Sequence, residues 1–271
     1  MSRISQCIAD LKAQNRKVLI PYIVAGDPDQ ATTVALMHTL VSNGADIIEL
    51  GIPFSDPSSD GTIIQLGAER ALRQGIRLLD VLVMVADFRT QDTSTPVVLM
   101  GYLNPVEIMG YQSFAEKARE AGVDGVLIVD LPVHESKEFL AAVHPQGLDT
   151  VFLIAPTTTE ARISAICAAS SGYIYYVSLK GVTGAAIIDS GEIKRRISHL
   201  RALTELPIVV GFGIKDAASA VAMAEVSDGV IVGSALVEKI ARLSDSARGD
   251  SEIQQSVALI SNLRHAIDNI K

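Results

Sequence analysis

Cysteine is scarce in this sequence of 271 residues, and its two copies, Cys7 and Cys167, stand far apart. A framework of disulfide bonds is therefore excluded, and the pattern predicts two free thiols in the reducing cytoplasm. The histidines are scattered without the spacing of metal ligands, so no metal site is predicted. Tryptophan is absent and aromatic residues make up only 4% of the chain, which leaves small aliphatic side chains to build the core. Such side chains suit helices packed on buried parallel strands.

Long apolar runs and an excess of positive charge are also missing. No run approaches the roughly 20 residues of a membrane-spanning helix, so no membrane association is expected. The formal net charge of −8 argues against nucleic acid as a partner, because phosphate backbones need clustered Lys and Arg. Residues 1–17 have the pattern of a polar amphipathic helix and lack the apolar centre of a signal peptide. We therefore expect a cytoplasmic protein with an extra helix at its N-terminus.

Short runs of β-branched residues alternate with longer stretches of helical periodicity along the whole chain. Strands without polar alternation, each followed by a helix, favour a parallel sheet covered on both faces. Eight strands are predicted, at Val18–Val24, Ile47–Leu50, Val97–Met100, Gly125–Val129, Thr150–Ile154, Ile174–Ser178, Ile208–Val210 and Gly229–Val232. Helices are predicted at Gln30–Asn43, Leu78–Thr90, Gln112–Ala121, Glu135–Val143, Thr159–Ala169, Ile193–Leu203, Ala217–Glu225 and Ser251–Ile270.

This order of elements predicts the α/β class and a (β/α)₈ TIM barrel, with residues 1–271 forming a single domain. A doubly wound open sheet is the main alternative. It would be expected to carry a Gly-rich turn after the first strand, whereas only Ala25-Gly26-Asp27 follows here. Asp29 is expected at the start of the first barrel helix, and Thr157 to Thr159 are expected to cap the helix that Glu160 begins.

The strongest candidate for chemistry follows the second predicted strand. Functional residues of TIM barrels lie at the carboxyl ends of the strands, and Glu49 is among the last residues of this strand. Partial burial would raise the pKa of its carboxyl and suit it to give and take protons near neutral pH. A buried Glu satisfied by a neighbouring hydroxyl or amide is the structural alternative. Asp56 and Asp60 lie in the loop that follows, where they could accept hydrogen bonds from a substrate or simply shape the turn.

Glycines follow the last three predicted strands. The segment 180–191, which contains Thr183, has the length of a lid that excludes water, or of a plain surface loop. Gly213 follows the seventh strand, and Gly233 and Ser234 follow the eighth. Loops after these two strands, with the start of a short helix, form a recurrent phosphate site in TIM barrels. We therefore expect the backbone amides of these three residues to bind a phosphate group.

With these residues in view, the sequence resembles the alpha subunit of tryptophan synthase over almost its whole length. The most specific match is the string Glu49-Leu50-Gly51-Ile52-Pro53-Phe54-Ser55-Asp56-Pro57, followed by Asp60-Gly61 and by the later Gly181-Val182-Thr183-Gly184. Further matches are Pro21–Pro28, Tyr102, Asn104, Asp130-Leu131-Pro132, Ala155-Pro156-Thr157 and Gly211–Ile214. There are departures. Ser58, Ser59 and Thr62 replace an apolar pair and a second proline that many members carry, and Ala186 stands where an Arg is often found.

The resemblance implies a lyase of tryptophan biosynthesis, of the carbon–carbon or carbon–oxygen class, that cleaves indole-3-glycerol phosphate to indole and glyceraldehyde 3-phosphate. It implies that no cofactor is held by this chain. Glu49 would then be the general acid/base at indole C3 and at the glycerol hydroxyl, and Asp60 would accept from the indole N–H. The implied substrate-binding residues are Tyr22, Met100, Leu127, Tyr175, Thr183, Gly184, Phe212, Gly213, Gly233 and Ser234. Taken singly, the apolar members of this set are as typical of an ordinary core.

The resemblance further implies an α₂β₂ assembly in which the beta subunit carries pyridoxal phosphate and receives indole through a tunnel. Asp56, Pro57 and Asn104 would face that partner. Two alternatives stay open at this point. One is another TIM barrel acting on a phosphorylated sugar, such as an isomerase; a Lys in a strand or a His at a strand end would favour it, and neither occurs in the predicted strands. The other is a ligand-binding activator subunit of a beta partner, with little turnover of its own.

Overall fold

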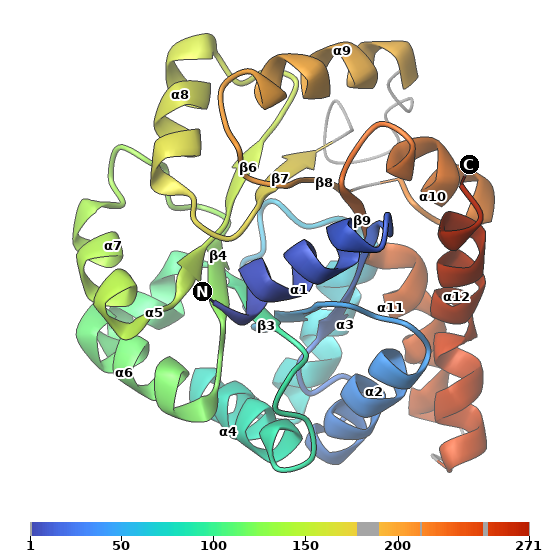
Figure 1. Ribbon diagram of the computed structural model, residues 1–271. Coiled ribbons are helices and arrows are strands. Elements are labelled where there is room, and N and C mark those ends of the chain that lie inside the picture. The colour runs from blue at the N-terminus through green and yellow to red at the C-terminus, as the bar shows by residue number, and fades with distance from the viewer. Residues whose placement is uncertain (1, 178–189, 212, 246–248, 271) are drawn as a thin grey trace.

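The computed structural model describes residues 2–177, 190–211, 213–245 and 249–270. Within these ranges nine strand segments form one parallel sheet whose order follows the chain around a ring (Figure 1). The segments are β1 (Val18–Val24), β2 (Ile48–Gly51), β3 (Val97–Gly101), β4 (Gly125–Ile128), β5 (Asp149–Thr150), β6 (Phe152–Ile154), β7 (Ile174–Val177), β8 (Ile208–Gly211) and β9 (Gly229–Val232).

The sheet closes through β5 and β6. β5 pairs with β4, β6 pairs with β7, and only Val151 separates the two short segments. Val151 N donates to Val126 O at 3.0 Å, so the pairing with β4 continues through the break. The two segments therefore act as one barrel strand with a local interruption, and the predicted (β/α)₈ TIM barrel is confirmed. Each predicted strand is present within one or two residues of its predicted bounds.

Helices surround the barrel (Figure 1). Those that match a predicted helix are α1 (Arg3–Ala13), α2 (Gln30–Ser42), α4 (Leu78–Arg89), α6 (Tyr111–Ala121), α7 (Lys137–Val143), α8 (Glu160–Ala169), α9 (Ser190–Arg201), α10 (Ala217–Ala224) and α12 (Asp250–Asp268). Those that were not predicted are α3 (Thr62–Arg73), α5 (Leu103–Met109), α11 (Ser234–Ile240) and two 3₁₀ turns, η1 (His144–Gln146) and η2 (Ala241–Asp245). The three unpredicted α-helices all follow strand ends, and residues of α3 and α11 line the cavity described below.

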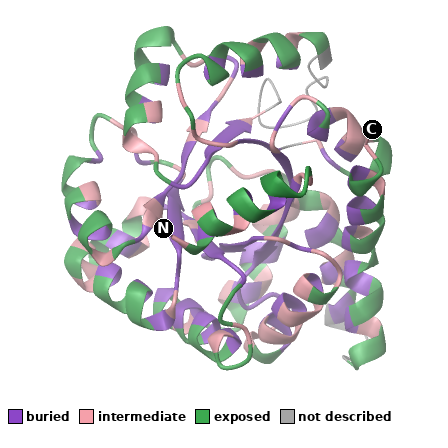
Figure 2. Ribbon diagram, in the orientation of Figure 1, coloured by how far each residue is buried: buried purple, intermediate pink, exposed green. Residues whose placement is uncertain are grey.

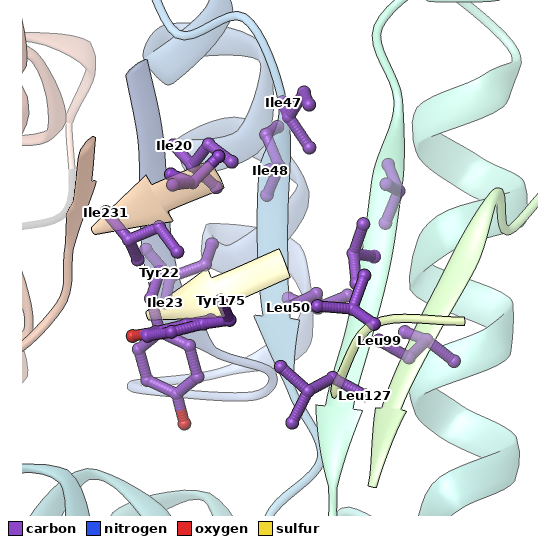
Figure 3. Close-up of a cluster of buried hydrophobic side chains, with 14 of the residues drawn as sticks. Ile20, Tyr22, Ile23, Ile47, Ile48, Leu50, Leu99, Leu127, Tyr175 and Ile231 are labelled. Atoms are coloured by element: carbon purple, nitrogen blue, oxygen red, sulfur yellow. The ribbon is translucent and has the colours of Figure 1, made fainter. Parts of the chain in front are cut away.

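Burial explains why the strands lack polar alternation. The strands are almost entirely buried, whereas the helices expose their outer faces (Figure 2). Inside the barrel, branched and aromatic side chains fill the space between strands (Figure 3). Full burial of one Leu or Ile stabilises the fold by about 2 kcal/mol, so this core is the main source of stability. Among the described residues, no helix is long and apolar enough to span a bilayer.

The helix starts follow the capping expectation in one case and depart from it in another. Asp29 caps α2, and its Oδ1 accepts from Thr32 N at 2.8 Å, as predicted. Thr159 is the N-cap of α8, but its side chain makes no capping hydrogen bond. Thr158 Oγ1 instead accepts from Ala155 N at 3.0 Å, which stabilises the turn before the helix. Thr159 therefore occupies the predicted cap position before Glu160, but no threonine side chain makes the capping hydrogen bond.

The extra N-terminal helix α1 lies across the amino-terminal end of the barrel (Figure 1). Its Ile4 is fully buried, and a Cβ on Gly125, the first residue of β4, would lie 2.9 Å from Ile4 Cδ1. Cys7 Sγ lies 3.4 Å from Asp46 O, just before β2. α1 therefore covers one end of the barrel and leaves the carboxyl ends of the strands on the other side.

Candidate active site

A cavity of 250 Å³ lies at the carboxyl ends of the strands, on the side of the barrel away from α1. Its walls come from β1, β3, β7 and β9 and from the segments that follow β2, β8 and β9. The lining residues are Tyr22, Asp60, Gly61, Ile64, Met100, Tyr175, Gly213, Ile214, Ile231, Gly233 and Ser234. The cavity thus combines apolar walls with one carboxyl and several backbone amides, as small-molecule sites do.

Two larger hollows, of 390 and 610 Å³, lie beside α1 at the amino-terminal end of the barrel. Each contains a charged pair: Arg201 with Asp228 at 2.9 Å in one, and Arg3 with Asp124 at 2.7 Å in the other. In TIM barrels this end contributes stability, whereas active sites lie at the carboxyl ends of the strands. The smaller cavity is therefore the candidate active site.

Glu49 lies on β2 and is fully buried beside its register partner Tyr22. Tyr173 Oη donates to Glu49 Oε1 at 2.5 Å, and no donor among the described residues reaches Oε2. Burial raises the pKa of Glu49 to about 7, while the Tyr173 hydrogen bond acts in the opposite direction. A carboxyl with this pKa exchanges a proton readily near neutral pH.

Asp60 lies in the loop between β2 and α3. Burial raises the pKa of this carboxyl to about 6, and a hydrogen bond from Tyr102 acts in the opposite direction. Tyr102 also holds the loop, because its Oη accepts from Ser59 N at 3.0 Å and its ring stacks on Phe54 with 5.3 Å between centroids. Gln65 Nε2 donates to Asp60 O at 2.8 Å. The loop therefore fixes a second protonatable carboxyl on the cavity wall.

Tyr22 of β1 and Tyr175 of β7 both line the cavity, and both are drawn in Figure 3. Each ring lies over a glycine. A Cβ on Gly51 would lie 2.2 Å from Tyr22 Oη, and one on Gly211 would lie 2.2 Å from Tyr175 Oη. Burial raises the pKa of both phenols well above the usual range, and the two carboxyls described above raise it further. Both carboxyls thus lie close enough to the two phenols to raise the pKa of each.

Backbone amides gather at the wall formed after β8 and β9. Gly213, Gly233 and Ser234 all line the cavity, as the sequence predicts. Gly233 is the N-cap of α11, and Ser234 is its first residue. Gly213 has a φ of +78°, which glycine adopts without the strain that a side chain would cause. Amides at the start of a helix favour an anion, and the role of these residues as phosphate ligands stays a prediction.

The remaining substrate-binding candidates divide into three groups. Met100 ends β3 and lines the cavity. Leu127 is 1% exposed and does not line it; this side chain packs in the barrel core (Figure 3). Thr183, Gly184 and Phe212 lie outside the described residues.

The candidate partner residues lie at the surface. Asp56 is exposed, and its Oδ2 accepts from Ser55 Oγ at 2.6 Å. Pro57 is half-buried, and Asn104 is exposed near the start of α5. Because Tyr102 is the N-cap of α5 and bonds to the loop after β2, this loop and the start of α5 adjoin.

The sequence did not predict several residues of the site. Tyr173 precedes β7 and bonds to Glu49, while Ile64, Ile214 and Ile231 line the cavity. A signal for Tyr173 was present, since side chains two apart on a strand point the same way and Tyr175 had been assigned to the site. Ile64 belongs to α3, which was not predicted.

Replacing Tyr173 with Phe is expected to raise the pKa of Glu49 above about 7, because the substitution removes the hydrogen bond that stabilises the carboxylate. Infrared titration of the protonated carboxyl band measures this shift. Tyr176→Phe is the matched control: Tyr176 is buried on β7, three residues along the chain, and its Oη has no partner among the described residues. An unchanged pKa in Tyr173→Phe would show that the hydrogen bond does not tune Glu49.

The fold and the cavity define a TIM-barrel protein with two protonatable carboxyls near one partly apolar cavity. Within the described ranges, no cluster of His, Cys, Asp and Glu could hold a metal ion. Comparison with known proteins then gives the family. The family model described as tryptophan synthase alpha chain matches residues 8–268.

Full-length relatives agree with this match. The tryptophan synthase alpha chain of Marinobacter nauticus is 56% identical, covering 100% of this chain and 99% of the relative. That of Methylococcus capsulatus is 52% identical over 99% of this chain and 100% of the relative. The crystal structure of tryptophan synthase subunit alpha from Legionella pneumophila is 46% identical, with a TM-score of 0.91 and full coverage of both chains. This chain belongs to the tryptophan synthase alpha chain family.

Proposed function

We propose that this chain cleaves indole-3-glycerol phosphate to indole and glyceraldehyde 3-phosphate, with Glu49 and Asp60 as its catalytic residues. The alpha-subunit role in tryptophan biosynthesis and the lyase class follow from the family. The bond we assign to the reaction is the carbon–carbon bond between indole C3 and the glycerol chain. The observation that carries the proposal is the pair of carboxyls with raised pKa values beside one cavity.

Glu49 can perform both proton transfers of this cleavage. In its protonated form it gives a proton to indole C3, which turns the indole into a leaving group. The bond from C3 to the glycerol carbon then breaks, its electron pair returns to the indole ring, and the hydroxyl on that carbon becomes an aldehyde. The hydroxyl proton passes to Glu49, so the carboxyl ends as it began. A pKa of about 7 suits a group that must serve as acid and base in one cycle.

Asp60 provides the negative charge that the protonated indole ring requires. Protonation at C3 leaves positive charge on the indole ring, and a carboxylate at the ring N–H stabilises that charge in a partly buried site. Asp60 lines the cavity and is held by Tyr102, so it meets this requirement without a large rearrangement. The apolar walls from Ile64, Met100 and Ile231 suit the faces of an indole ring.

The phosphate is assigned to the wall formed after β8 and β9. Gly213, Gly233 and Ser234 offer backbone amides and the start of α11 to the dianion. We further propose that Thr183 and Gly184 close over the site and that Phe212 contributes to the indole wall. The three amide-bearing residues, the Asp60 carboxyl and the apolar walls line one cavity, which supports a substrate with an aromatic and an anionic end.

The partner is a tryptophan synthase beta subunit, as the family implies. We propose an α₂β₂ assembly in the cytoplasm, with pyridoxal phosphate on the beta subunit and indole passing to it through a tunnel. Asp56, Pro57 and Asn104 are the proposed contacts, and their position on an adjoining loop and helix supports this. We also propose a single domain over residues 1–271, which one continuous core in the described residues supports.

The proposed reaction predicts that the chain alone releases indole and glyceraldehyde 3-phosphate in equal amounts. We expect a beta subunit to increase this rate without changing the products. Indole release from indole-3-glycerol phosphate, measured with and without a beta subunit, tests both statements. Release that is undetectable under both conditions would contradict the proposal and favour a ligand-binding activator subunit.

A further inference from the structure

A buried ion pair joins the loop after β1 to α3. Arg70 Nε donates to Asp27 Oδ1 at 2.7 Å, and Arg70 Nη2 donates to Asp27 Oδ2 at 2.8 Å. The Asp27 side chain is only 1% exposed, against 22% for Arg70. Burying such a pair costs nearly as much free energy as the pairing returns, so stability alone is a poor reason for its presence. Its bidentate geometry fixes the relative orientation of the two elements as well as the distance between them.

The same region of α3 fits closely against its neighbours. A Cβ on Gly67 would lie 3.2 Å from Asp27 Oδ2 and 3.1 Å from Val237 Cγ1 of α11. Just beyond α3, Ile76 packs on the turn after β1, where a Cβ on Gly26 would lie 2.3 Å from Ile76 Cγ1. Helix α3 is therefore wedged between the loop after β1 and α11, and the ion pair sets its place.

The other end of α3 is at the active site. The helix has twelve residues, so it is a rigid rod of about 18 Å. Gly61 is its N-cap, and Asp60 stands immediately before that cap. Its neighbour α11 begins with the amides of Gly233 and Ser234. A shift of α3 at the ion pair would therefore move Asp60 relative to both the barrel and the proposed phosphate site.

We propose that Asp27 and Arg70 are positioning residues, whose ion pair holds α3 so that Asp60 meets the indole N–H while α11 holds the phosphate. Neither residue lines the cavity, so both act through the placement of α3. This inference rests on the proposed function of Asp60.

Arg70→Lys keeps the positive charge and removes the bidentate contact with Asp27. We expect kcat for indole release to fall about tenfold with a smaller change in KM, because small misplacements of catalytic groups are costly. Asp27→Asn should give the same pattern. Arg89→Lys is the matched control, since Arg89 pairs with the buried Asp124 at 2.7 Å at the amino-terminal end of the barrel, away from the cavity. This control should lower the melting temperature and leave kcat unchanged.

A double-variant cycle separates positioning from general loss of stability. If Arg70 acts through Asp60, Arg70→Lys should reduce kcat much less in an Asp60→Asn background than in the wild type. If the loss in kcat of the double variant equals the product of the losses of the two single variants, the positioning role is overturned. Full activity of Asp60→Asn alone would instead overturn the proposed function. A third outcome would overturn only this inference. In it, Asp60→Asn loses activity, but Arg70→Lys lowers the melting temperature and leaves kcat unchanged, as Arg89→Lys does.

Discussion

Replacing Glu49 with Gln should lower kcat for indole release by about 10³-fold, the middle of the range for general acid–base catalysis. The amide has nearly the same shape and can still accept a hydrogen bond from Tyr173. It can neither give a proton to indole C3 nor take one from the glycerol hydroxyl. Because Glu49 is fully buried, water has poor access to replace it as the proton carrier.

The chain offers a matched control for this substitution. Tyr111 Oη donates to Glu107 Oε1 at 2.8 Å, so Glu107 has the same kind of partner as Glu49 but lies on the exposed surface of α5. Glu107→Gln should keep wild-type turnover in the isolated chain. Steady-state indole assays on both variants decide the matter, and near-full cleavage by Glu49→Gln would mean that another group carries the proton.

The same variant should be more stable than the wild type in alkaline solution. The pKa of Glu49 is raised in the folded protein, so the carboxyl contributes stability fully below about pH 4.5 and loses that contribution as pH rises through about 7. Gln carries no charge at any pH and avoids this loss. Melting temperatures at pH 5 and pH 8 should therefore differ less in Glu49→Gln than in the wild type. A variant that is more stable but turns over more slowly would show that the Glu49 carboxyl serves catalysis at a cost in stability.

Much of the fold follows from the sequence because burial on both faces leaves strands of uninterrupted apolar residues. Val18–Val24 and Gly229–Val232 have the predicted bounds, since polar or turn residues flank them on both sides. The break at Val151 depends on the fit of one strand between two neighbours, which no local pattern encodes. α3 was not predicted because its small and polar residues form an interface with α11 and β1 that appears only in the folded barrel.

The residues of the site also fall into those that the sequence predicts and those that it does not. Glu49, Asp60 and the glycines after the last strands follow from their places at strand ends together with the family motif. Tyr173 and the ion pair of Asp27 with Arg70 do not, because each joins residues distant in sequence. Leu127 was assigned to the substrate site from the resemblance; its side chain is 1% exposed and is not among the residues that line the cavity. A strand position gives a side chain's layer in a barrel only once the register between strands is known.

Asp60→Asn should lower kcat for indole release by about 10²-fold and change its pH dependence. The proposed mechanism requires Asp60 to be ionised and Glu49 to be protonated in the wild type, so activity should fall below about pH 6 and above about pH 7. Burial keeps the facing phenols of Tyr22 and Tyr175 neutral throughout this range, because it raises the pKa of both. Asn has no charge to lose, so the acidic limb should disappear while the alkaline limb stays.

The pH profile of kcat thus assigns each limb to one carboxyl. Asp87→Asn, at an exposed position on α4, removes the same charge away from the cavity and should leave both limbs in place. If the acidic limb survived in Asp60→Asn, another group would be responsible for it, and a carboxylate at the indole N–H would no longer be required. If the alkaline limb vanished instead, the two carboxyls would have exchanged roles, with Asp60 as the proton donor. Because the two pKa values are about one unit apart, only a narrow range of pH holds both carboxyls in the required state, and loss of either limb would widen it.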